Sequence, residues 1–258
     1  MRNLSGSFAG IYRICFIAVL FISMNVKCWS QAKKTTYVIV HGAWGGSWAF
    51  KKVDSLITAQ GHTVYRPSLT GQGERVHLAS AAVDLNTHIN DVVNTIVFED
   101  LHDIILVGHS YGGMVITGVA DKVHDRIRKL IYLDAMVPND GETVLAIMDP
   151  KGNSLKPMIK GDYLVPPWVK ADQKPPKDVP HPLKTFTQPI VLKNEAAKKI
   201  PATYILTVDP GKKAEEDGFY PSSQRAKQRG WQVYEMTADH NPQWSAPQEL
   251  VTRLLKEL

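Results

Sequence analysis

The stretch LVGHSYGGMVITGVA, residues 106–120, decides the fold, because it holds the pattern G-H-S-Y-G around Ser110. A continuous apolar run precedes the serine and a helical pattern follows it, which is the strand-to-helix context that a nucleophile elbow requires. At so sharp a turn, the residues two positions away must lack side chains, and Gly108 and Gly112 meet this need. We therefore predict that Ser110 is a nucleophile rather than an ordinary serine of a Gly-rich loop.

Strands and helices alternate on both sides of this stretch. Continuous or alternating apolar runs predict strands at residues 35–42, 62–69, 103–110, 129–135, 202–209 and 231–236. Helical patterns lie between them, including one from an expected cap at Asn86 to about residue 99 and a last one over residues 247–258. This alternation predicts an α/β fold, with a mostly parallel sheet flanked by helices.

The alternation stops between residues 136 and 200. Residues 174–182 are rich in proline and exclude a central strand or the interior of a helix. An irregular segment of this length is too long for a plain connection, so we expect a cap inserted between two core strands. A separate small domain or a disordered loop is the alternative; the aromatic residues Tyr163, Trp168 and Phe186 favour a packed cap.

The N-terminus differs in character from the rest of the chain. Basic residues precede a short apolar run at 14–24, which is typical of a signal peptide over residues 1–30, followed by a single domain over 31–258. We expect cleavage and export to the periplasm or the exterior, with no membrane attachment afterwards; an uncleaved anchor is the alternative. Cleavage would remove both cysteines and three basic residues, so the formal charge of +5 falls to +2 and gives no argument for nucleic acid.

A base for Ser110 is expected at His240. It follows the strand predicted at 231–236, and loops at the carboxyl ends of parallel strands share one edge of the sheet. His41 fits the loop after the first strand better, and His88 is expected on the surface of a helix.

The acid that orients the base is expected at Asp209, at the end of the strand predicted over 202–209. This gives the order serine, acid, histidine that α/β-hydrolases show. Asp134 competes, because it also ends a core strand, whereas Asp209 follows the strand nearest in sequence to His240. Asp217 is a more distant alternative.

Two backbone N–H groups are expected to stabilise an oxyanion. One belongs to Tyr111, directly after the serine, and the other to the loop HGAWGGSW, residues 41–48. Ala43 is the best candidate in that loop and Trp44 the next, while a plain Gly-rich turn is the alternative reading.

Four motifs together resemble a known superfamily. They are HGAWGGSW at 41–48, GHSYGGMVITG at 108–118, LIYLDAMVP at 130–138 and ADHNPQWSAPQEL at 238–250. In this order and spacing they look like the α/β-hydrolase superfamily, and within it they resemble the methylesterase and hydroxynitrile lyase group and its bacterial esterase relatives, including pyrethroid-hydrolase-like enzymes. The resemblance implies hydrolysis of small carboxylic esters with no cofactor or metal, and it supports Ala43, Tyr111 and Asp209 in the roles given above.

The sequence departs from the lyase branch at two positions. The lyases carry Thr and Lys where this chain has Gly42 and Asn241, which disfavours cyanohydrin cleavage. A lactonase, an amidase, a C–C hydrolase and a non-catalytic binding protein on the same scaffold stay open. Trp44, Trp168 and Trp244 are candidates for lining the pocket of a small ester substrate.

Overall fold

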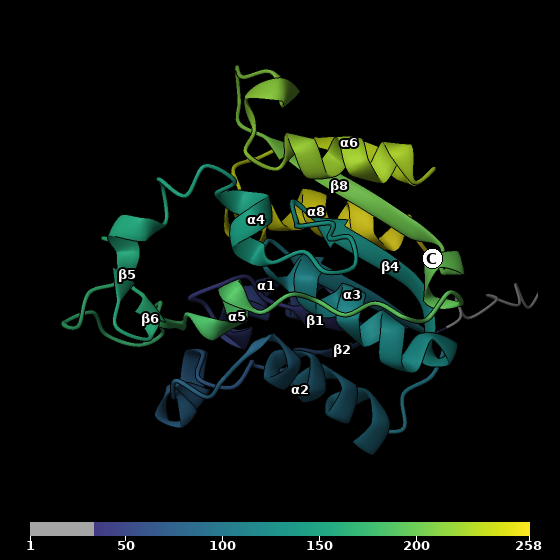
Figure 1. Ribbon diagram of the computed structural model, residues 1–258. Coiled ribbons are helices and arrows are strands. Elements are labelled where there is room, and N and C mark those ends of the chain that lie inside the picture. Colours follow the sequence, from purple (N-terminus) through teal and green to yellow (C-terminus); the bar gives the residue numbers. More distant parts are fainter. Residues whose placement is uncertain (1–33) are drawn as a thin grey trace, which may run out of the picture. The chain divides into compact units, whose positions relative to one another are not determined.

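Six parallel strands form the central sheet of the computed structural model, which describes residues 34–258 (Figure 1). Their spatial order is β2-β1-β3-β4-β8-β9, with bounds Thr36–Val40 (β1), Thr63–Tyr65 (β2), Ile104–His109 (β3), Ile127–Leu133 (β4), Ala202–Val208 (β8) and Gln232–Thr237 (β9). The predicted α/β fold with a mostly parallel sheet is thereby confirmed. The predicted leader over residues 1–30 lies outside the described residues.

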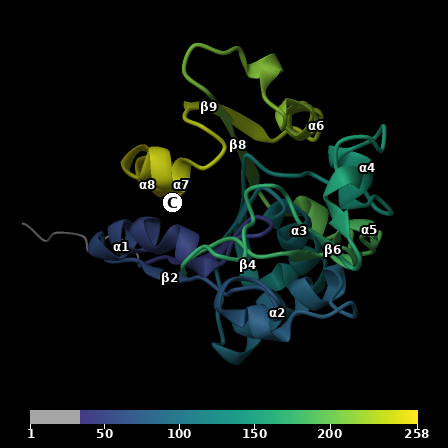
Figure 2. The ribbon, with the colours of Figure 1, turned by 90° about the vertical axis from the view of Figure 1, so that its left-hand side faces the viewer.

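Helices cover both faces of this sheet (Figure 2). On one face lie α1 (Lys51–Ala59) and α8 (Pro247–Leu255); the other carries α2 (Leu85–Phe98), α3 (Gly112–Val123) and α6 (Tyr220–Gln228). Successive side chains of a strand point to opposite faces. Tyr37 and Ile39 accordingly join the core of the first face and Val38 and Val40 that of the second, and all four are buried. Burial on both faces explains the uninterrupted apolar runs of these strands.

Two of the boundaries that differ from the sequence prediction have a clear physical reason. Helix α2 is capped by Asp84, not by Asn86: the Asp84 carboxylate accepts the Thr87 N–H at 2.9 Å, and the Thr87 hydroxyl reaches back to form a capping box. Strand β2 covers only Thr63–Tyr65 of the predicted 62–69, since Pro67 has no N–H to give to a ladder.

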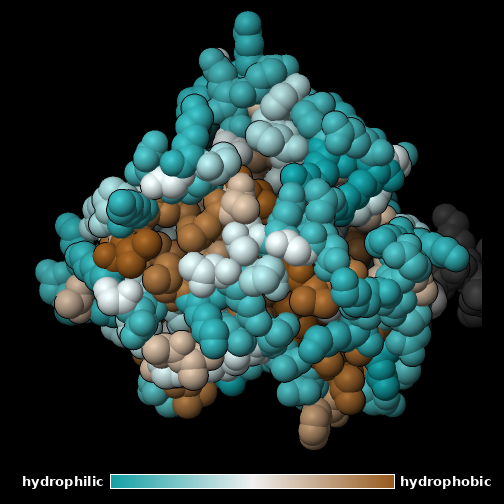
Figure 3. Space-filling model, in the orientation of Figure 1, coloured by the Kyte–Doolittle hydropathy of each residue, from teal (hydrophilic) through white to brown (hydrophobic). Residues whose placement is uncertain are grey.

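The segment between β4 and β8 folds over the sheet as a set of short elements. It contains α4 (Val144–Met148), η4 (Lys156–Met158), β5 (Ile159–Lys160), β6 (Tyr163–Leu164), β7 (His181–Pro182), α5 (Lys184–Thr187) and η5 (Ala197–Lys199). Strands β5, β6 and β7 form a small antiparallel sheet. Leu164 and Phe186 are fully buried in the main core, so this segment, called the cap below, is packed. Figure 3 shows apolar surface near α4 and β5, the elements that carry the exposed Met148 and Ile159.

The remaining elements are short connections. They are η1 (Ser47–Phe50), η2 (Gly73–Leu78), η3 (His124–Arg126), η6 (Ala214–Glu216) and α7 (Pro242–Ser245). Within residues 34–258, no helix combines the length and the apolar character needed to cross a bilayer.

Candidate active site

Ser110 occupies a strained turn between β3 and α3. Its φ of 56° lies in the left-handed region, which is uncommon for a residue with a side chain. A Cβ on Gly108 would lie 2.6 Å from the carbonyl oxygen of Gly112, and one on Gly112 would lie 2.7 Å from that of Val40. Both contacts are closer than real Cβ atoms tolerate, so the turn requires glycine at these two positions.

A continuous chain of hydrogen bonds links the serine to a carboxylate. Nε2 of His240 lies 3.0 Å from the Ser110 Oγ, and Nδ1 of the same ring lies 2.6 Å from the Asp134 Oδ2. Asp134 is fully buried, and its second oxygen accepts the Thr207 N–H at 3.2 Å. A buried carboxylate fixed in this way holds the imidazole in one orientation, with Nε2 facing the serine.

The prediction that Asp209 contacts His240 is wrong, because Asp134 takes that place. The Asp209 side chain is 41% exposed and forms an ion pair with Lys212 at 2.7 Å. The strand order gives the reason: β4, which precedes Asp134, pairs directly with the serine-bearing β3, whereas β8 lies one strand further away.

Asp217, the more distant alternative for the acid, does not contact the His240 imidazole. Its Oδ1 accepts the N–H of Phe219 at 2.7 Å. Burial, and then the negative charge of Asp134, raise the pKa of the Asp217 carboxyl above its usual value. Asp217 therefore interacts electrostatically with Asp134, but it takes no part in the hydrogen bonds that join Asp134, His240 and Ser110.

Two further groups hold His240, and the sequence did not point to either. The ring of Phe219 stacks on the imidazole, with centroids 4.8 Å apart and planes 6° from parallel. Nε2 of His109 lies 2.7 Å from the backbone oxygen of His240. Burial, followed by the charge of His240, lowers the pKa of His109 to about 3, so the ring is neutral and its N–H donates to that oxygen. His109 belongs to the G-H-S-Y-G pattern, which was the available signal for it.

Both N–H groups expected to stabilise the oxyanion are free to donate a hydrogen bond. Within residues 34–258, neither the N–H of Ala43 nor that of Tyr111 has a hydrogen-bond partner. Gly42 brings the first loop against the serine, since a Cβ on it would lie 3.1 Å from the Ser110 Cβ. The N–H of Trp44, the second choice in this loop, is instead directed at the Nδ1 of His181 at 3.2 Å.

Two other histidines behave as parts of the core. His88 was expected on the surface but is fully buried, where Nδ1 accepts from the Tyr111 hydroxyl and Nε2 donates to the Thr70 oxygen, each at 2.9 Å. His41 donates through Nδ1 to the Gly42 oxygen at 2.7 Å, and its Nε2 accepts the Leu69 N–H at 3.1 Å. Burial lowers the pKa of His41 to about 4 and that of His88 to about 3, so both serve as neutral hydrogen-bonding groups.

The three tryptophans suggested for the pocket occupy different places. The indole N–H of Trp44 donates to the Leu164 oxygen in the cap at 3.2 Å, and its ring meets that of Trp168 edge to face. Trp244 stacks on Trp48 with centroids 5.5 Å apart. Trp168 and Trp244 share a cavity of about 330 Å³ whose lining includes neither Ser110 nor His240.

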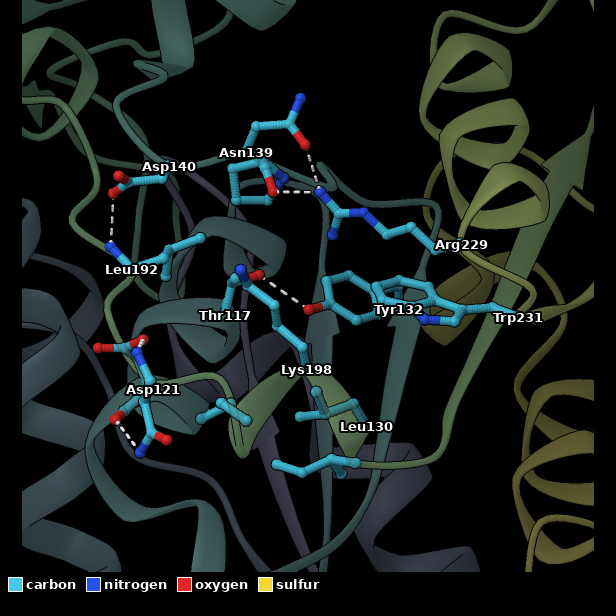
Figure 4. A pocket seen from close by; sticks show the side chains of 15 residues that line it. Thr117, Asp121, Leu130, Tyr132, Asn139, Asp140, Leu192, Lys198, Arg229 and Trp231 are labelled. Atoms are coloured by element: carbon cyan, nitrogen blue, oxygen red, sulfur yellow. Dashed lines mark hydrogen bonds between the residues drawn. The ribbon is translucent and has the colours of Figure 1, made fainter.

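A larger cavity of about 580 Å³ is lined by residues of α3, β4 and the cap, among them Thr117, Tyr132 and Asn139 (Figure 4). It too lacks Ser110 and His240, and its polar side chains already have partners. The Tyr132 hydroxyl bonds the Thr117 hydroxyl at 2.8 Å, and Arg229 donates to the Pro138 and Asn139 oxygens. In residues 34–258, no three His, Cys, Asp or Glu side chains are grouped to hold a metal ion.

The fold and the hydrogen-bonded Ser110–His240–Asp134 arrangement define the class as an α/β-hydrolase with a serine at its elbow. The sequence profile of the alpha/beta hydrolase family matches residues 37–253, and the chain belongs to this family. It is 36% identical over 247 residues to a carbendazim hydrolyzing esterase of Nocardioides sp. (strain SG-4G), an alignment that covers 84% of this chain and 97% of that protein.

Solved structures of other proteins share this fold. An extracellular alpha/beta-hydrolase from a Paenibacillus species superposes with a TM-score of 0.73 at 24% identity, covering 86% of this chain and 98% of the other. The methylesterase MES16 from Arabidopsis superposes with a TM-score of 0.66 at 26% identity, covering 86% and 98%. The expected resemblance to methylesterases and bacterial esterases is confirmed, and so is the expected enzyme class, a hydrolase of carboxylic esters.

Proposed function

We propose that this protein hydrolyses small carboxylic esters through an acyl-enzyme on Ser110. The observation that carries the proposal is the chain of hydrogen bonds from the Asp134 carboxylate through both nitrogens of His240 to the Ser110 hydroxyl. A serine is a weak nucleophile by itself and needs an adjacent base that is oriented by a third group. The same arrangement on this fold favours catalysis over ligand binding alone.

The proposed reaction has two halves. Nε2 of His240 takes the proton of the Ser110 hydroxyl while Oγ attacks the ester carbonyl, and the oxyanion forms between the N–H groups of Ala43 and Tyr111. The C–O bond to the alcohol then breaks, and His240 returns the proton to the leaving oxygen. Water, deprotonated by the same nitrogen, attacks the acyl-enzyme, and the carboxylic acid leaves as Ser110 regains its proton.

Ser110→Ala tests this proposal directly. We expect hydrolysis of nitrophenyl acetate to fall by at least about 10⁴-fold in kcat, because removal of a triad nucleophile abolishes the covalent route. A fluorophosphonate should label the wild type at Ser110 and leave the variant unlabelled. Ser55→Ala is the matched control, because this serine is exposed on α1 and, among residues 34–258, its hydroxyl bonds only the Lys51 oxygen. Turnover by Ser110→Ala within a few-fold of wild type would overturn the proposal, and absence of labelling would favour a binding protein.

The acyl and alcohol groups of the substrate are the next question for the same site. The Nocardioides relative is named for hydrolysis of carbendazim. A panel of esters graded in acyl and alcohol size, with carbendazim as one member, would identify the preferred class. Preference for short chains on both sides would support a small-ester hydrolase, and preference for a cyclic ester or an amide would replace it with a lactonase or an amidase.

We also infer that the chain is exported after cleavage near residue 30. The support is the basic region followed by the apolar run 14–24. The intact mass of the protein recovered from the producing cell and its medium tests this. Retention of residues 1–30 on a membrane-bound form would contradict it.

A further inference from the structure

Trp44 lies in a strained turn directly after Ala43. Its φ is 65°, and the Gly45 N–H donates to the Ala43 oxygen at 2.8 Å. A hydrogen bond between residues two apart around a centre with positive φ is a γ-turn of the rare, strained kind. Such a conformation persists only where the surroundings over-determine it.

The cap supplies that support through three hydrogen bonds with Trp44. The Trp44 N–H is directed at the Nδ1 of His181 at 3.2 Å, and the Trp44 oxygen accepts the Val179 N–H at 2.8 Å. The indole N–H donates to the Leu164 oxygen at 3.2 Å. The peptide plane between Ala43 and Trp44 is therefore held at both ends, by Gly45 at its C=O and by His181 at its N–H.

His181 is neutral, so one of its two ring nitrogens is free to accept a hydrogen bond. The ring is fully buried, and burial lowers its pKa well below the usual value, helped by the neighbouring His88 and His41. Within the described residues Nε2 has no partner, so the polar contacts of the ring go through Nδ1. Nδ1 also lies 3.0 Å from the Gln72 Oε1, an acceptor. With the ring proton on Nε2, Nδ1 accepts the Trp44 N–H; with the proton on Nδ1, it donates to Gln72 instead, so the two hydrogen bonds exclude each other.

From these contacts we propose that His181 is a positioning residue of the cap, which holds the turn at Trp44 so that the Ala43 N–H faces the oxyanion. The proposal rests on the proposed function, since it assigns a task to the Ala43 donor. It also gives the cap a part in the rate of the reaction. An oxyanion donor acts only once negative charge develops on the carbonyl oxygen, so the effect belongs to kcat and not to ground-state binding.

A matched pair of substitutions at His181 distinguishes hydrogen bonding to the Trp44 N–H from simple packing of the ring. His181→Asn carries an acceptor oxygen near the place of Nδ1, whereas His181→Gln carries the same amide oxygen near the place of Nε2. We expect His181→Gln to lower kcat for nitrophenyl acetate by about tenfold with KM little changed, less than the 10² to 10³ of losing a donor outright. His181→Asn should retain most of the wild-type kcat. Equal kcat values for the two variants would overturn the proposal.

Two further measurements sharpen the result. A trifluoromethyl ketone forms a tetrahedral adduct on the serine, whereas the matching methyl ketone reports the ground state. His181→Gln should weaken binding of the first by about tenfold and leave the second unchanged; equal weakening of both would contradict the proposal. Gln72→Met removes the competing contact of His181 and should leave kcat near that of wild type; a loss as large as that of His181→Gln would indicate a packing role.

Failure of this proposal differs from failure of the proposed function. If Ser110→Ala abolishes turnover and a fluorophosphonate labels Ser110, while His181→Gln hydrolyses the ester at the wild-type rate, only the role of His181 is wrong. If Ser110→Ala remains active, the acyl-enzyme itself is wrong. Thermal melting of each variant shows whether any loss reflects unfolding.

Discussion

The ends of β4 and β8 offer the same side chain in two different settings. Each strand is buried in the sheet and each is followed directly by an aspartate, Asp134 after Leu133 and Asp209 after Val208. Asp134 has a φ of 43°, is fully buried and bonds His240 at 2.6 Å. Asp209 opens a turn, is 41% exposed and pairs with Lys212.

The comparison shows that strand pairing determines which carboxylate contacts His240. β4 pairs with β3, so its end lies next to the serine elbow, where the Ser110 N–H donates to the Leu133 oxygen at 3.2 Å. The segment after β8 contributes to the site in another way, through the ring of Phe219 and the charge of Asp217. Three substitutions test this division, in order of expected effect.

Asp134→Asn should have the largest effect of the three. We expect kcat for an ester to fall by about 10³- to 10⁴-fold, since an amide neither fixes the correct tautomer of His240 nor stabilises the imidazolium. Steady-state kinetics measures this, with Asp209→Asn as the matched control. The control should keep kcat within about twofold and its free energy of unfolding within about 1 kcal/mol, as expected of an exposed ion pair. The reverse ranking would return the role to Asp209.

Phe219→Leu should have an intermediate effect. Loss of the stacked ring loosens His240, and aromatic pairs contribute about 0.5–1.5 kcal/mol beyond burial, which corresponds to about a two- to twelvefold loss in kcat. Phe219→Tyr keeps the ring and should stay close to wild type. If both variants match wild type, the segment after β8 has no part in holding the base.

Asp217→Asn should have the smallest effect, and it should appear in stability. Because the folded-state pKa of Asp217 is raised by burial and by Asp134, folding favours its protonated form. The stability that Asp217 contributes through protonation is fully present at pH values below its unfolded pKa, near 3.8. It is lost as pH rises through the higher pKa of the folded state. The amide still accepts the Phe219 N–H, so the variant should be more stable than wild type at pH 7 and equal to it near pH 3.5.

Urea unfolding at the two pH values measures this difference, and ester kinetics gives the second readout. We expect kcat within about threefold of wild type, because Asp217 makes no bond to His240. A loss as large as that of Asp134→Asn would show that both carboxylates share the work of orienting the base.

The local parts of the site were predictable because their signals are local. The elbow needs glycines at fixed offsets from a serine between a strand and a helix, and residues 106–120 show all of this within fifteen positions. His240 follows from its place after a strand. The N-cap of α2 and the length of β2 were harder to predict from the sequence. Several polar residues near Asp84 could cap the helix, and Pro67 ends the hydrogen bonding of the strand early.

The burial of His88 could not be predicted in the same way. Its position on a helix suggests a surface residue. The groups that contact it, the Thr70 oxygen and the Tyr111 hydroxyl, come from distant parts of the chain. The contact between His181 and Trp44 joins residues 137 positions apart and has no sequence signal.

By itself, the sequence determined that this chain forms a parallel α/β sheet, places a serine on a strained elbow and supplies a histidine at the same edge. Apolar periodicity and glycine spacing specify these features locally. The tertiary structure alone decided which aspartate meets that histidine and which cap residue contacts Trp44 in the loop of Ala43. Both depend on which strands and loops become neighbours in space, and the order β2-β1-β3-β4-β8-β9 is set by long-range packing rather than by any local pattern.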